Sequence, residues 1–311
     1  MTLIPDIQGA EAFSKAKDDT RLWRAVIEKL GGDYGFSGEI RQFYNGSTVV
    51  ASIGDEAVIK LFEPWTLALH SNEASALGFL HSMVPIPTPK LFGSGKIEDW
   101  GYLVMERLPG ENLTSQWDKI EADNLAAICA EVGHYTRVLH SLPIPPDPRL
   151  QETWREFAQE RKELCIERHR CSGIVNDSLL AEISDYVEDA ALEDEELVFL
   201  HTELDSNNVL VNFDNGRWQL SGLVDFEPST VGYREYDYAG PSIFLARGDG
   251  ARFSAWAEGC KADLDSRTRK RILQWILLHR YSNLRYYFEV VGRKSIPSTL
   301  VEIGDILVPQ F

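Results

Sequence analysis

The pattern of the sequence changes at Leu108-Pro109-Gly110, and this change restricts the chain to folds with two unlike parts. On the N-terminal side, short β-branched and apolar runs separated by turn residues predict strands. On the C-terminal side, apolar residues recur at intervals of three and four, which predicts amphipathic helices. Proline and glycine interrupt both kinds of structure, so we expect a domain boundary between residues 1–107 and residues 108–311.

The N-terminal part is expected to form an antiparallel sheet with one helix. Residues 48–53 and 57–62 flank a turn sequence that contains glycine, which predicts a hairpin. Apolar residues at helical spacing predict a helix over 66–81, and the prolines that follow prevent its continuation. Two further strands are predicted at 90–95 and 100–105.

The C-terminal part is expected to be mainly helical. An apolar stripe lies at 125–139, charged helical patterns follow at 154–169 and 179–191, and a short strand is predicted at 197–200. A long helix is expected from Arg267 onward. Its aromatic residues could line a substrate cleft, but we favour core packing for the following three: Trp275, Tyr281 and Tyr286.

The net charge of the chain limits the classes of partner that it is expected to bind. A net charge of −17 argues against nucleic acid or an anionic membrane as a partner and would attract a cationic substrate. No apolar run approaches the roughly 18 residues that a spanning helix needs, and residues 1–10 show neither a secretory signal nor an Arg-rich transit peptide, so we expect a cytoplasmic protein. The four cysteines do not suggest a disulfide framework. Cys165, His169 and Cys171 lack a second pair at zinc-site spacing, so we expect no metal there.

One short region carries residues suited to phosphoryl transfer. His201 ends a strand, and Glu203 and Asn208 follow on a loop, five residues apart. A hairpin with the turn Asp214-Asn215-Gly216 then leads to Asp225. Transfer from ATP needs a carboxylate near the attacking hydroxyl and magnesium on the phosphates. Glu203 is therefore the candidate base, and Asn208 and Asp225 are candidate magnesium ligands.

Lys60 lies between apolar neighbours in a predicted strand, where a charge is out of place unless an anion meets it. Glu73, on the following helix, is suitably placed to hold the ammonium. The alternative is that Lys60 is a surface residue on the exposed face of a half-buried strand. We favour this alternative less, because Lys60, Glu73, Asn208 and Asp225 follow one another in the expected order. Tyr44-Asn45-Gly46-Ser47 offers a glycine for close approach to phosphate, although Asn-Gly is also an ordinary turn.

These residues resemble the aminoglycoside phosphotransferase family, whose members are relatives of protein kinases. His201-x-Glu203-x-x-x-x-Asn208 is similar to the catalytic loop of that family, and Asp225-Phe226-Glu227 is similar to its metal-binding triplet. The resemblance spans nearly the whole chain. The phrases most similar to the hygromycin B kinase branch are His-Thr-Glu-Leu, Gly222-Leu-Val-Asp-Phe-Glu-Pro228, Glu235-Tyr-Asp237 and Ala246-Arg-Gly-Asp249.

The resemblance implies a role in nucleotide binding for each residue that matches the family's pattern. Lys60 would bind the α- and β-phosphates of ATP, and Glu73 would orient Lys60. The backbone around Met105 and Glu106 would hold the adenine, and the turn that contains Ser47 would approach the phosphates.

The resemblance also implies roles around the catalytic loop. Asn208 and Asp225 would hold Mg²⁺, His201 would support the loop, and Asp237 would brace it. Glu203 departs from the family, which mostly has aspartate there, so its longer side chain must reach the acceptor by a different rotamer or from a withdrawn loop.

Asp205 is a second candidate for the base. Its spacing to Asn208 is three rather than five, so we prefer Glu203. Asp205 and Glu227 could instead contact an aminated substrate, but for both we favour a solvated loop carboxylate.

We therefore predict an α+β, protein-kinase-like fold with an N-terminal nucleotide-binding lobe and a mostly helical C-terminal lobe. The resemblance implies an ATP-dependent kinase that phosphorylates a hydroxyl of a small molecule, and we favour an aminoglycoside-type antibiotic such as hygromycin B, with resistance as the result. The protein would act as a monomer or homodimer. The alternatives are a kinase of another hydroxylated metabolite or nucleoside antibiotic, and a pseudokinase that binds nucleotide without transfer.

Overall fold

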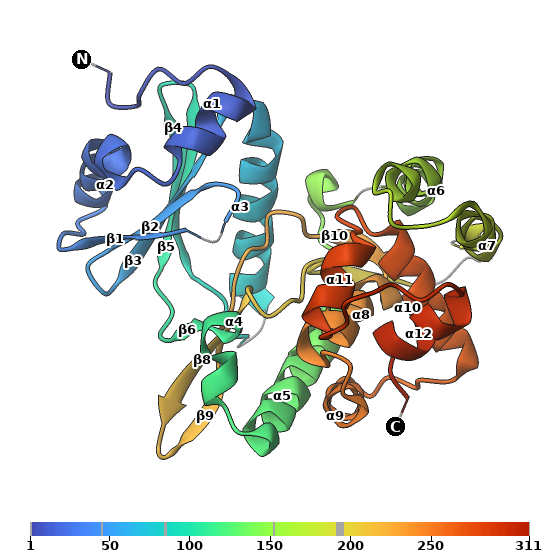
Figure 1. Cartoon of the computed structure of the whole chain (residues 1–311). Coiled ribbons are helices and arrows are strands. Elements are labelled where there is room, and N and C mark those ends of the chain that lie inside the picture. Colours follow the sequence, from blue (N-terminus) through green and yellow to red (C-terminus); the bar gives the residue numbers. More distant parts are fainter. Residues whose placement is uncertain (1, 45, 84–85, 152, 191–195, 311) are drawn as a thin grey trace. The chain divides into compact units, whose positions relative to one another are not determined.

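The computed structural model describes residues 2–44, 46–83, 86–151, 153–190 and 196–310. The chain forms two compact units (Figure 1). The first comprises Met1–Gly110 and Ser221–Pro228, and the second comprises Glu111–Leu220 and Ser229–Phe311. The first unit therefore includes a late segment of the chain, which carries Asp225.

An antiparallel sheet of five strands forms the centre of the first unit, in the order β1-β2-β3-β5-β4. The elements are α1 (Gly9–Ala16), α2 (Thr20–Asp33), β1 (Ile40–Phe43), β2 (Val49–Ile53), β3 (Ala57–Phe62), α3 (Leu67–Met83), β4 (Leu91–Ile97) and β5 (Trp100–Glu106). β3 lies between β2 and β5, and Lys60 at its centre pairs with Val50 and Leu103.

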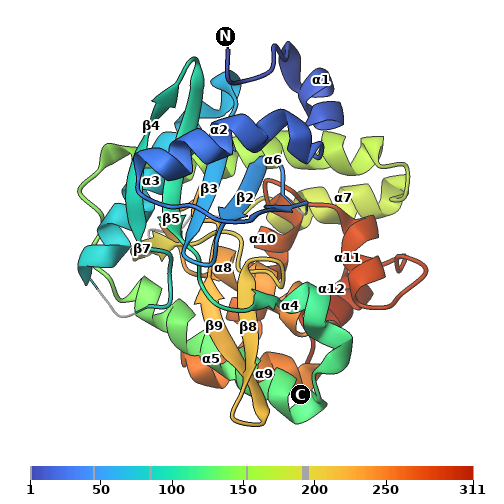
Figure 2. The ribbon, with the colours of Figure 1, turned by 90° about the vertical axis from the view of Figure 1, so that its left-hand side faces the viewer.

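The two faces of this sheet meet different helices. Side chains alternate between the faces of a strand, so Ile59 and Leu61 of β3 point to one side. There they join a buried apolar core with Trp23 of α2, and Figure 2 shows α2 running across this face of the sheet. The alternation places Lys60 on the opposite face, where α3 carries Glu73.

The first unit contains two helices, α1 and α2, that the sequence analysis did not predict. Their signals are nevertheless present in the sequence. Asp19 caps α2 by accepting a hydrogen bond from the backbone of Arg21. The buried residues of α2 recur at helical spacing: Trp23, Val26, Ile27 and Leu30.

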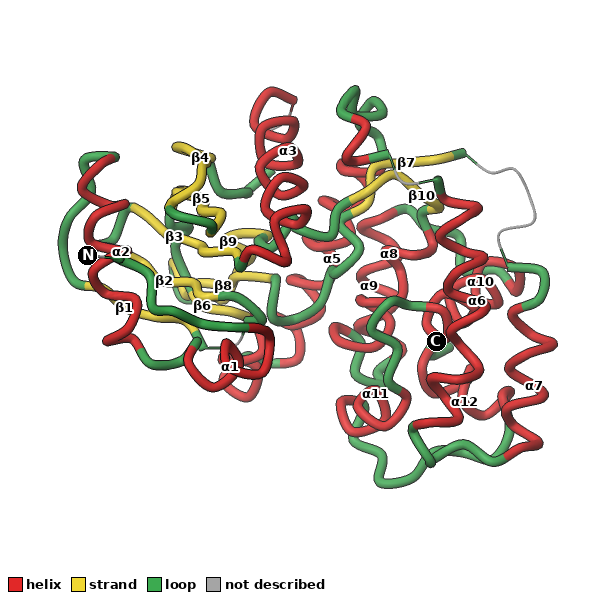
Figure 3. The backbone as a smooth tube through the Cα atoms, turned by 90° about the horizontal axis from the view of Figure 1, so that it is seen from above, coloured by secondary structure: helices red, strands yellow, loops and turns green. Residues whose placement is uncertain are grey.

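Helices dominate the second unit (Figure 3). They are α4 (Leu113–Gln116), α5 (Ala122–His140), α6 (Trp154–Cys171), α7 (Asp177–Val187), α8 (Glu235–Gly240), α9 (Gly250–Cys260), α10 (Ser266–Leu278), α11 (Leu284–Val290) and α12 (Leu300–Leu307). The strands outside the large sheet are β6 (Glu111–Asn112), β7 (Leu197–Leu200), β8 (Val209–Asp214), β9 (Arg217–Leu223) and β10 (Thr230–Tyr233). No helix among the described residues combines the length and the apolar character needed to cross a bilayer.

The predicted long C-terminal helix is wrong. α10 ends at Leu278 because His279 has an extended backbone, with ψ 142°. A new helix, α11, then starts where the Asn283 side chain accepts a hydrogen bond from the backbone of Tyr286. Trp275 is buried as expected, but Tyr281 and Tyr286 are 58% and 45% exposed, so the core role predicted for these two tyrosines is also wrong.

Two glycines allow α5 and α9 to pack closely. A Cβ atom on Gly133 of α5 would collide with the carbonyl oxygen of Trp256, and one on Gly259 of α9 would collide with that of Ala130. Backbone atoms cannot move aside as a flexible side chain can, so each glycine is required by packing.

We expect Gly133→Ala to lower the free energy of unfolding by about 1–3 kcal/mol, because the added methyl group forces the two helices apart. Urea denaturation would measure the change. Gly78→Ala is the control, because nothing lies within 4 Å of the added methyl group in the exposed part of α3, and it should be neutral or slightly stabilising. Equal stability of Gly133→Ala and the parent protein would contradict this account of the packing.

Candidate active site

Lys60 is buried within β3, with 5% of its surface exposed. Lysine is seldom buried without a partner, and the structure supplies carboxylates. The Lys60 ammonium lies 2.9 Å from Glu73 Oε2, 2.7 Å from Asp225 Oδ1 and 2.8 Å from Glu227 Oε2. All four residues belong to the first unit. The alternative of a surface lysine is therefore wrong.

The returning segment Ser221–Pro228 is anchored on α3. The backbone N–H of the buried Phe226 donates to Glu73 Oε1 (3.3 Å), and Asn72 Nδ2 donates to the carbonyl of Glu227 (2.6 Å). Asp225 has a positive φ of 70°, a left-handed conformation that aspartate tolerates better than most residues. These contacts present the Asp225 and Glu227 carboxylates to Lys60.

The cluster formed by Lys60, Glu73, Asp225 and Glu227 carries more negative than positive charge. Burial alone would lower the pKa of Lys60, but the charges of Asp225, Glu73 and Glu227 outweigh it and raise that pKa well above its usual value. Burial also raises the pKa of Glu73 to about 7; Lys60 opposes this rise, and the other two carboxylates add to it.

An excess of carboxylate oxygens is suited to a hard divalent cation. Oxygen atoms of Glu73, Asp225 and Glu227 lie within 4.8 Å of one another. The donor set therefore fits magnesium, and among the described residues this is the group whose ligand atoms converge. Cys165, His169 and Cys171 do not form such a group, and all four cysteines are free.

Glu227 is the member of the cluster whose position the sequence analysis missed. The interpretation as a solvated loop carboxylate is wrong, because Glu227 is 8% exposed and contacts Lys60. The available signal was its spacing from Asp225. Residues two apart in an extended segment point to the same side, so the two acids could be expected to face one partner.

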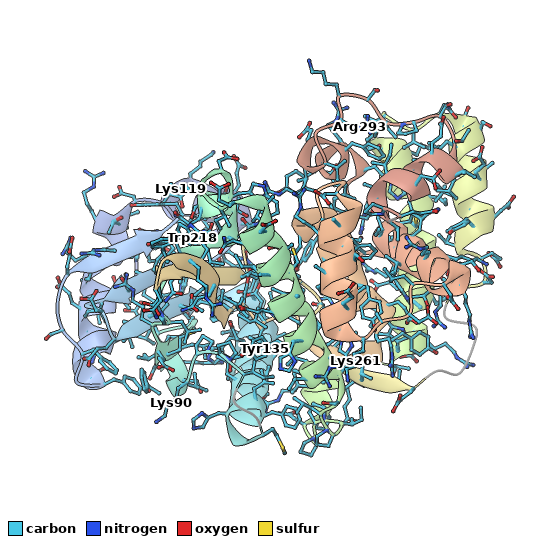
Figure 4. The ribbon with its side chains drawn as sticks, turned by 90° about the horizontal axis from the view of Figure 1, so that it is seen from below. Lys90, Lys119, Tyr135, Trp218, Lys261 and Arg293 are labelled. Carbon is cyan, nitrogen blue, oxygen red and sulfur yellow. The ribbon has the colours of Figure 1, made fainter. Side chains whose placement is uncertain are left out.

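The other predicted nucleotide-binding residues lie at the edges of the first unit's strands. Met105 and Glu106 end β5. The backbone N–H of Glu106 donates to the carbonyl of Lys90 (2.8 Å), and Glu106 Oε2 accepts from the Lys90 N–H (3.2 Å); Figure 4 labels Lys90. Ser47 is exposed before β2. Asn45, which was part of the same prediction, lies outside the described residues.

In the second unit, Asp237 holds the loop that follows β7. This buried carboxylate accepts the backbone N–H groups of His201 (3.1 Å) and Thr202 (2.6 Å). Thr202 has φ 72°, which is unusual for a β-branched residue and costs on the order of 1–3 kcal/mol. His140 of α5 contacts the same carboxylate through Nε2 (2.9 Å). The structure thus places Asp237 where it fixes a strained loop.

The two candidate bases are held differently within this loop. The Glu203 backbone N–H donates to His201 Nδ1 (3.3 Å), and its carbonyl accepts from Asn208 Nδ2 (3.0 Å). The Asp205 carboxylate accepts the backbone N–H groups of Asn207 (2.7 Å) and Asn208 (3.2 Å). One oxygen of Asp205 is therefore used to close the loop.

The predicted residues form two groups. The first unit contains Lys60, Glu73 and Asp225, and the second contains Glu203, Asp205 and Asn208. The two predicted magnesium ligands, Asp225 and Asn208, therefore belong to different units.

His279 supports the strained loop from the segment after α10. Its Nδ1 accepts the backbone N–H of Tyr281 (3.3 Å), so the ring proton lies on Nε2, which donates to the carbonyl of Thr202 (3.1 Å). The imidazole stacks on Tyr236 with a centroid distance of 4.8 Å. Burial lowers the pKa of His279 to about 4. The ring is therefore neutral near pH 7, and protonation would remove its acceptor.

We expect the free energy of unfolding to fall as the pH drops from about 6.5 to about 4. Unfolded His279, with its ordinary pKa of about 6.5, binds a proton in this window, whereas the folded form does not, so acid favours unfolding. The full effect is at most about 3 kcal/mol. Urea denaturation across this range should give a flatter pH profile for His279→Gln than for the exposed control His134→Gln. Parallel profiles for the two variants would show that His279 does not titrate as described.

We expect Lys60→Met to lower the free energy of unfolding by about 3–5 kcal/mol, because it leaves buried carboxylates without their cation. Adding Glu73→Gln should recover part of this loss, since it removes one of those carboxylates. Chemical denaturation of the single and double variants measures both effects. A Lys60→Met protein as stable as the parent, or a double variant that is less stable than Lys60→Met, would contradict the ion cluster.

Comparison with known proteins places the chain in a family. The sequence profile of the phosphotransferase enzyme family matches residues 41–271. An aminoglycoside 3′-phosphotransferase of Streptomyces ribosidificus is 30% identical over 169 residues, which cover 52% of this chain and 60% of that protein. The chain thus spans less than two thirds of the length of this relative.

Solved structures share the fold at low sequence identity. The GDP complex of wild-type aminoglycoside 2′-phosphotransferase-IIIa superposes with a TM-score of 0.70 at 12% identity, over 88% of this chain and 98% of that one. A streptomycin–ATP ternary complex of APH(2″)-IIa gives a TM-score of 0.60 at 16% identity, over 86% and 94% of the two chains. These likenesses confirm the predicted α+β, protein-kinase-like fold, with its N-terminal antiparallel sheet and helical C-terminal part.

Proposed function

This chain belongs to the phosphotransferase enzyme family, and on that premise we propose that it transfers the γ-phosphoryl group of ATP to a hydroxyl group of a small molecule. The observation that carries the proposal is the buried Lys60 ammonium, which contacts both Glu73 and Asp225. Phosphoryl transfer depends on positioning and on neutralising phosphate charge, and a lysine held by a helix glutamate is suited to both.

The nucleotide would be bound mainly by the first unit. Lys60 would donate hydrogen bonds to the α- and β-phosphates, and Glu73 would keep its ammonium in place. The backbone near Met105 and Glu106 would hold the adenine, and the turn at Ser47 would lie over the phosphates. One of the similar solved structures is described with ATP and another with GDP.

Asp225 and Asn208 would hold magnesium, and Glu227 adds a third oxygen donor. The convergence of carboxylates around one ammonium supports the part of this assignment that concerns Asp225 and Glu227, because a divalent cation would balance their charge. Magnesium, when bound, would neutralise charge on the transferred phosphoryl group.

Glu203 would act on the acceptor. Its carboxylate would take the proton of the attacking hydroxyl as the new O–P bond forms, while the bond from the γ-phosphorus to the bridging oxygen breaks and ADP leaves. Asp237 and His201 would hold the loop in position. Asp205 remains the second candidate, but its use in closing the loop favours Glu203.

We expect Glu203→Gln to lower kcat by about 10²–10⁴-fold, because the amide cannot accept the proton. The affinity for ATP should stay within about threefold of the parent value. Asp205→Asn should lower kcat by no more than about tenfold, since an amide oxygen can still accept the two backbone N–H groups. Steady-state kinetics and nucleotide titration test both variants, and the reverse order of the two kcat losses would assign the base to Asp205.

The acceptor that we propose is an aminoglycoside-type antibiotic of the hygromycin B kind. The net charge of −17 and the aminoglycoside 3′-phosphotransferase among its relatives support this choice. Phosphorylation would remove a hydroxyl and add negative charge, which would confer resistance. We further propose a cytoplasmic monomer or homodimer that does not bind nucleic acid or a membrane.

A screen for ATP consumption distinguishes this acceptor class from others. It would compare hygromycin B, other aminoglycosides, nucleoside antibiotics and neutral sugars, and we expect the aminated compounds to be turned over best. A preference for uncharged acceptors would contradict the aminoglycoside assignment and favour a kinase of another metabolite. Tight binding of magnesium and ATP without turnover of any acceptor would favour a pseudokinase.

A further inference from the structure

A tryptophan lies on an element that is tied to the proposed acceptor loop. In the second unit, the Thr114 N–H donates to the carbonyl of Ser206 (3.0 Å), and Thr114 Oγ1 donates to Ser206 Oγ (2.8 Å). Thr114 belongs to α4, and Trp117 starts the 3₁₀ turn that follows and ends at Lys119; Lys119 is labelled in Figure 4. The turn that begins at Trp117 is therefore tied, through α4, to Ser206 of the loop 201–208.

Two guanidinium groups lie over this indole, and their other contacts differ. Arg252 Cζ is 5.5 Å from the ring centroid, and Arg252 is occupied by the carbonyl of Ala246 (2.9 and 2.7 Å) and by Asp249 (3.2 Å). Arg247 Cζ is only 3.5 Å from the centroid.

Most of the hydrogen-bond donors of Arg247 are not used within the described part of the chain. Its Nε donates to the carbonyl of Phe244 at 3.4 Å, a weak hydrogen bond. Within the described part of the chain, the two Nη groups of Arg247 have no hydrogen bond or ion pair. The indole thus fixes the plane of the guanidinium and leaves its fork of two nitrogens available.

The surroundings of Arg247 do not neutralise it. Burial lowers its pKa first, and the positive charge of Arg252 lowers it further; Asp118 acts in the opposite direction but forms no ion pair with it among the described residues. A half-buried guanidinium without a carboxylate partner is costly. Binding of oxygen atoms from a ligand would remove this cost.

Tyr286 connects Arg247 to the acceptor loop. Its ring is 5.8 Å from that of Phe244, whose carbonyl receives Arg247 Nε. The pKa of Tyr286 is raised by burial and then by the negative charge of Asp205 on the loop, while Arg247 lowers it. Tyr286 is 45% exposed, so its hydroxyl can also meet a ligand. Arg247, Tyr286 and Asp205 therefore belong to one neighbourhood.

We propose that Arg247 is a specificity-determining residue of the acceptor site, and that its two Nη groups bind a pair of neighbouring oxygen atoms on the acceptor. This inference rests on the proposed kinase function. A planar fork of donors matches a carboxylate or two adjacent hydroxyls and repels an ammonium group. The amino groups of an acceptor would thus be kept away from Arg247, and its oxygen-rich side would bind there.

Kinetics with the acceptor that the screen identifies is the first test. Arg247→Gln should raise KM by about 10- to 100-fold, the loss expected for a charge-assisted pair of hydrogen bonds, and change kcat by less than about threefold. Arg247→Lys keeps the charge but not the fork, so its KM should rise by a smaller factor. The control is Arg149→Gln, which removes an exposed arginine that is paired with Asp147. An unchanged KM in Arg247→Gln, with normal turnover, would overturn the inference and leave the kinase function intact.

A binding measurement without turnover tests the role of Arg247 separately from the proposed kinase function. Saturation-transfer NMR would compare sodium glucuronate, methyl glucoside and glucosamine with the parent protein and with Arg247→Gln. Loss of glucuronate binding alone would identify a carboxylate site, and loss of both glucuronate and methyl glucoside would identify an oxygen-pair site. Equal binding of all three probes to both proteins would overturn the inference, even if no acceptor were phosphorylated and the proposed function itself failed.

Discussion

A buried ammonium that contacts three carboxylates organises the first unit. A lysine in the middle strand of a sheet is costly to bury without partners, and its partners here come from distant parts of the sequence. α3 supplies Glu73, and the segment Ser221–Pro228 supplies Asp225 and Glu227. Because these carboxylates are needed around Lys60, that late segment packs with the N-terminal sheet and not with the helices that surround it in the sequence.

The second unit uses a buried carboxylate in a different way. Asp237 accepts two consecutive backbone N–H groups and holds Thr202 in a conformation that it would otherwise avoid. His279 then donates a hydrogen bond to the carbonyl of Thr202. The backbone of the loop that carries Glu203 is thus held by Asp237 and His279 from outside the loop and by Asp205 from within it. Glu203 takes part through its backbone N–H and carbonyl, and these two hydrogen bonds do not depend on the length of its side chain.

Much of the fold and part of the site could be predicted from the sequence. Lys60, Glu73 and Asp225 were recognisable because charged residues at buried positions need partners, and their order in the chain matched a known pattern. The hairpins followed from turn residues between β-branched runs. α1 and α2 were missed although Asp19 and the apolar spacing after it indicated a helix. The end of α10 was missed although Ser282-Asn283 interrupts the apolar pattern, and Asn283 is the residue that caps α11.

Residues whose role depends on tertiary contacts were harder to predict. Glu227 looked like a loop acid until its segment was seen to fold onto α3. Arg247 stood out only as part of the phrase Ala246-Arg-Gly-Asp249, because its contact with Trp117 and the lack of an acidic partner among the described residues are seen only in the folded chain. In both cases, tertiary contacts set the environment of the charge.

In the function proposed above, the carboxylates around Lys60 form a site for magnesium and nucleotide. Calorimetric titration of ATP with and without Mg²⁺, into the parent protein and into Asp225→Asn, tests it most directly. We expect magnesium to tighten ATP binding to the parent by at least about tenfold, and we expect this gain to disappear in Asp225→Asn. An equal magnesium dependence in both proteins, or no ATP binding to the parent, would contradict it.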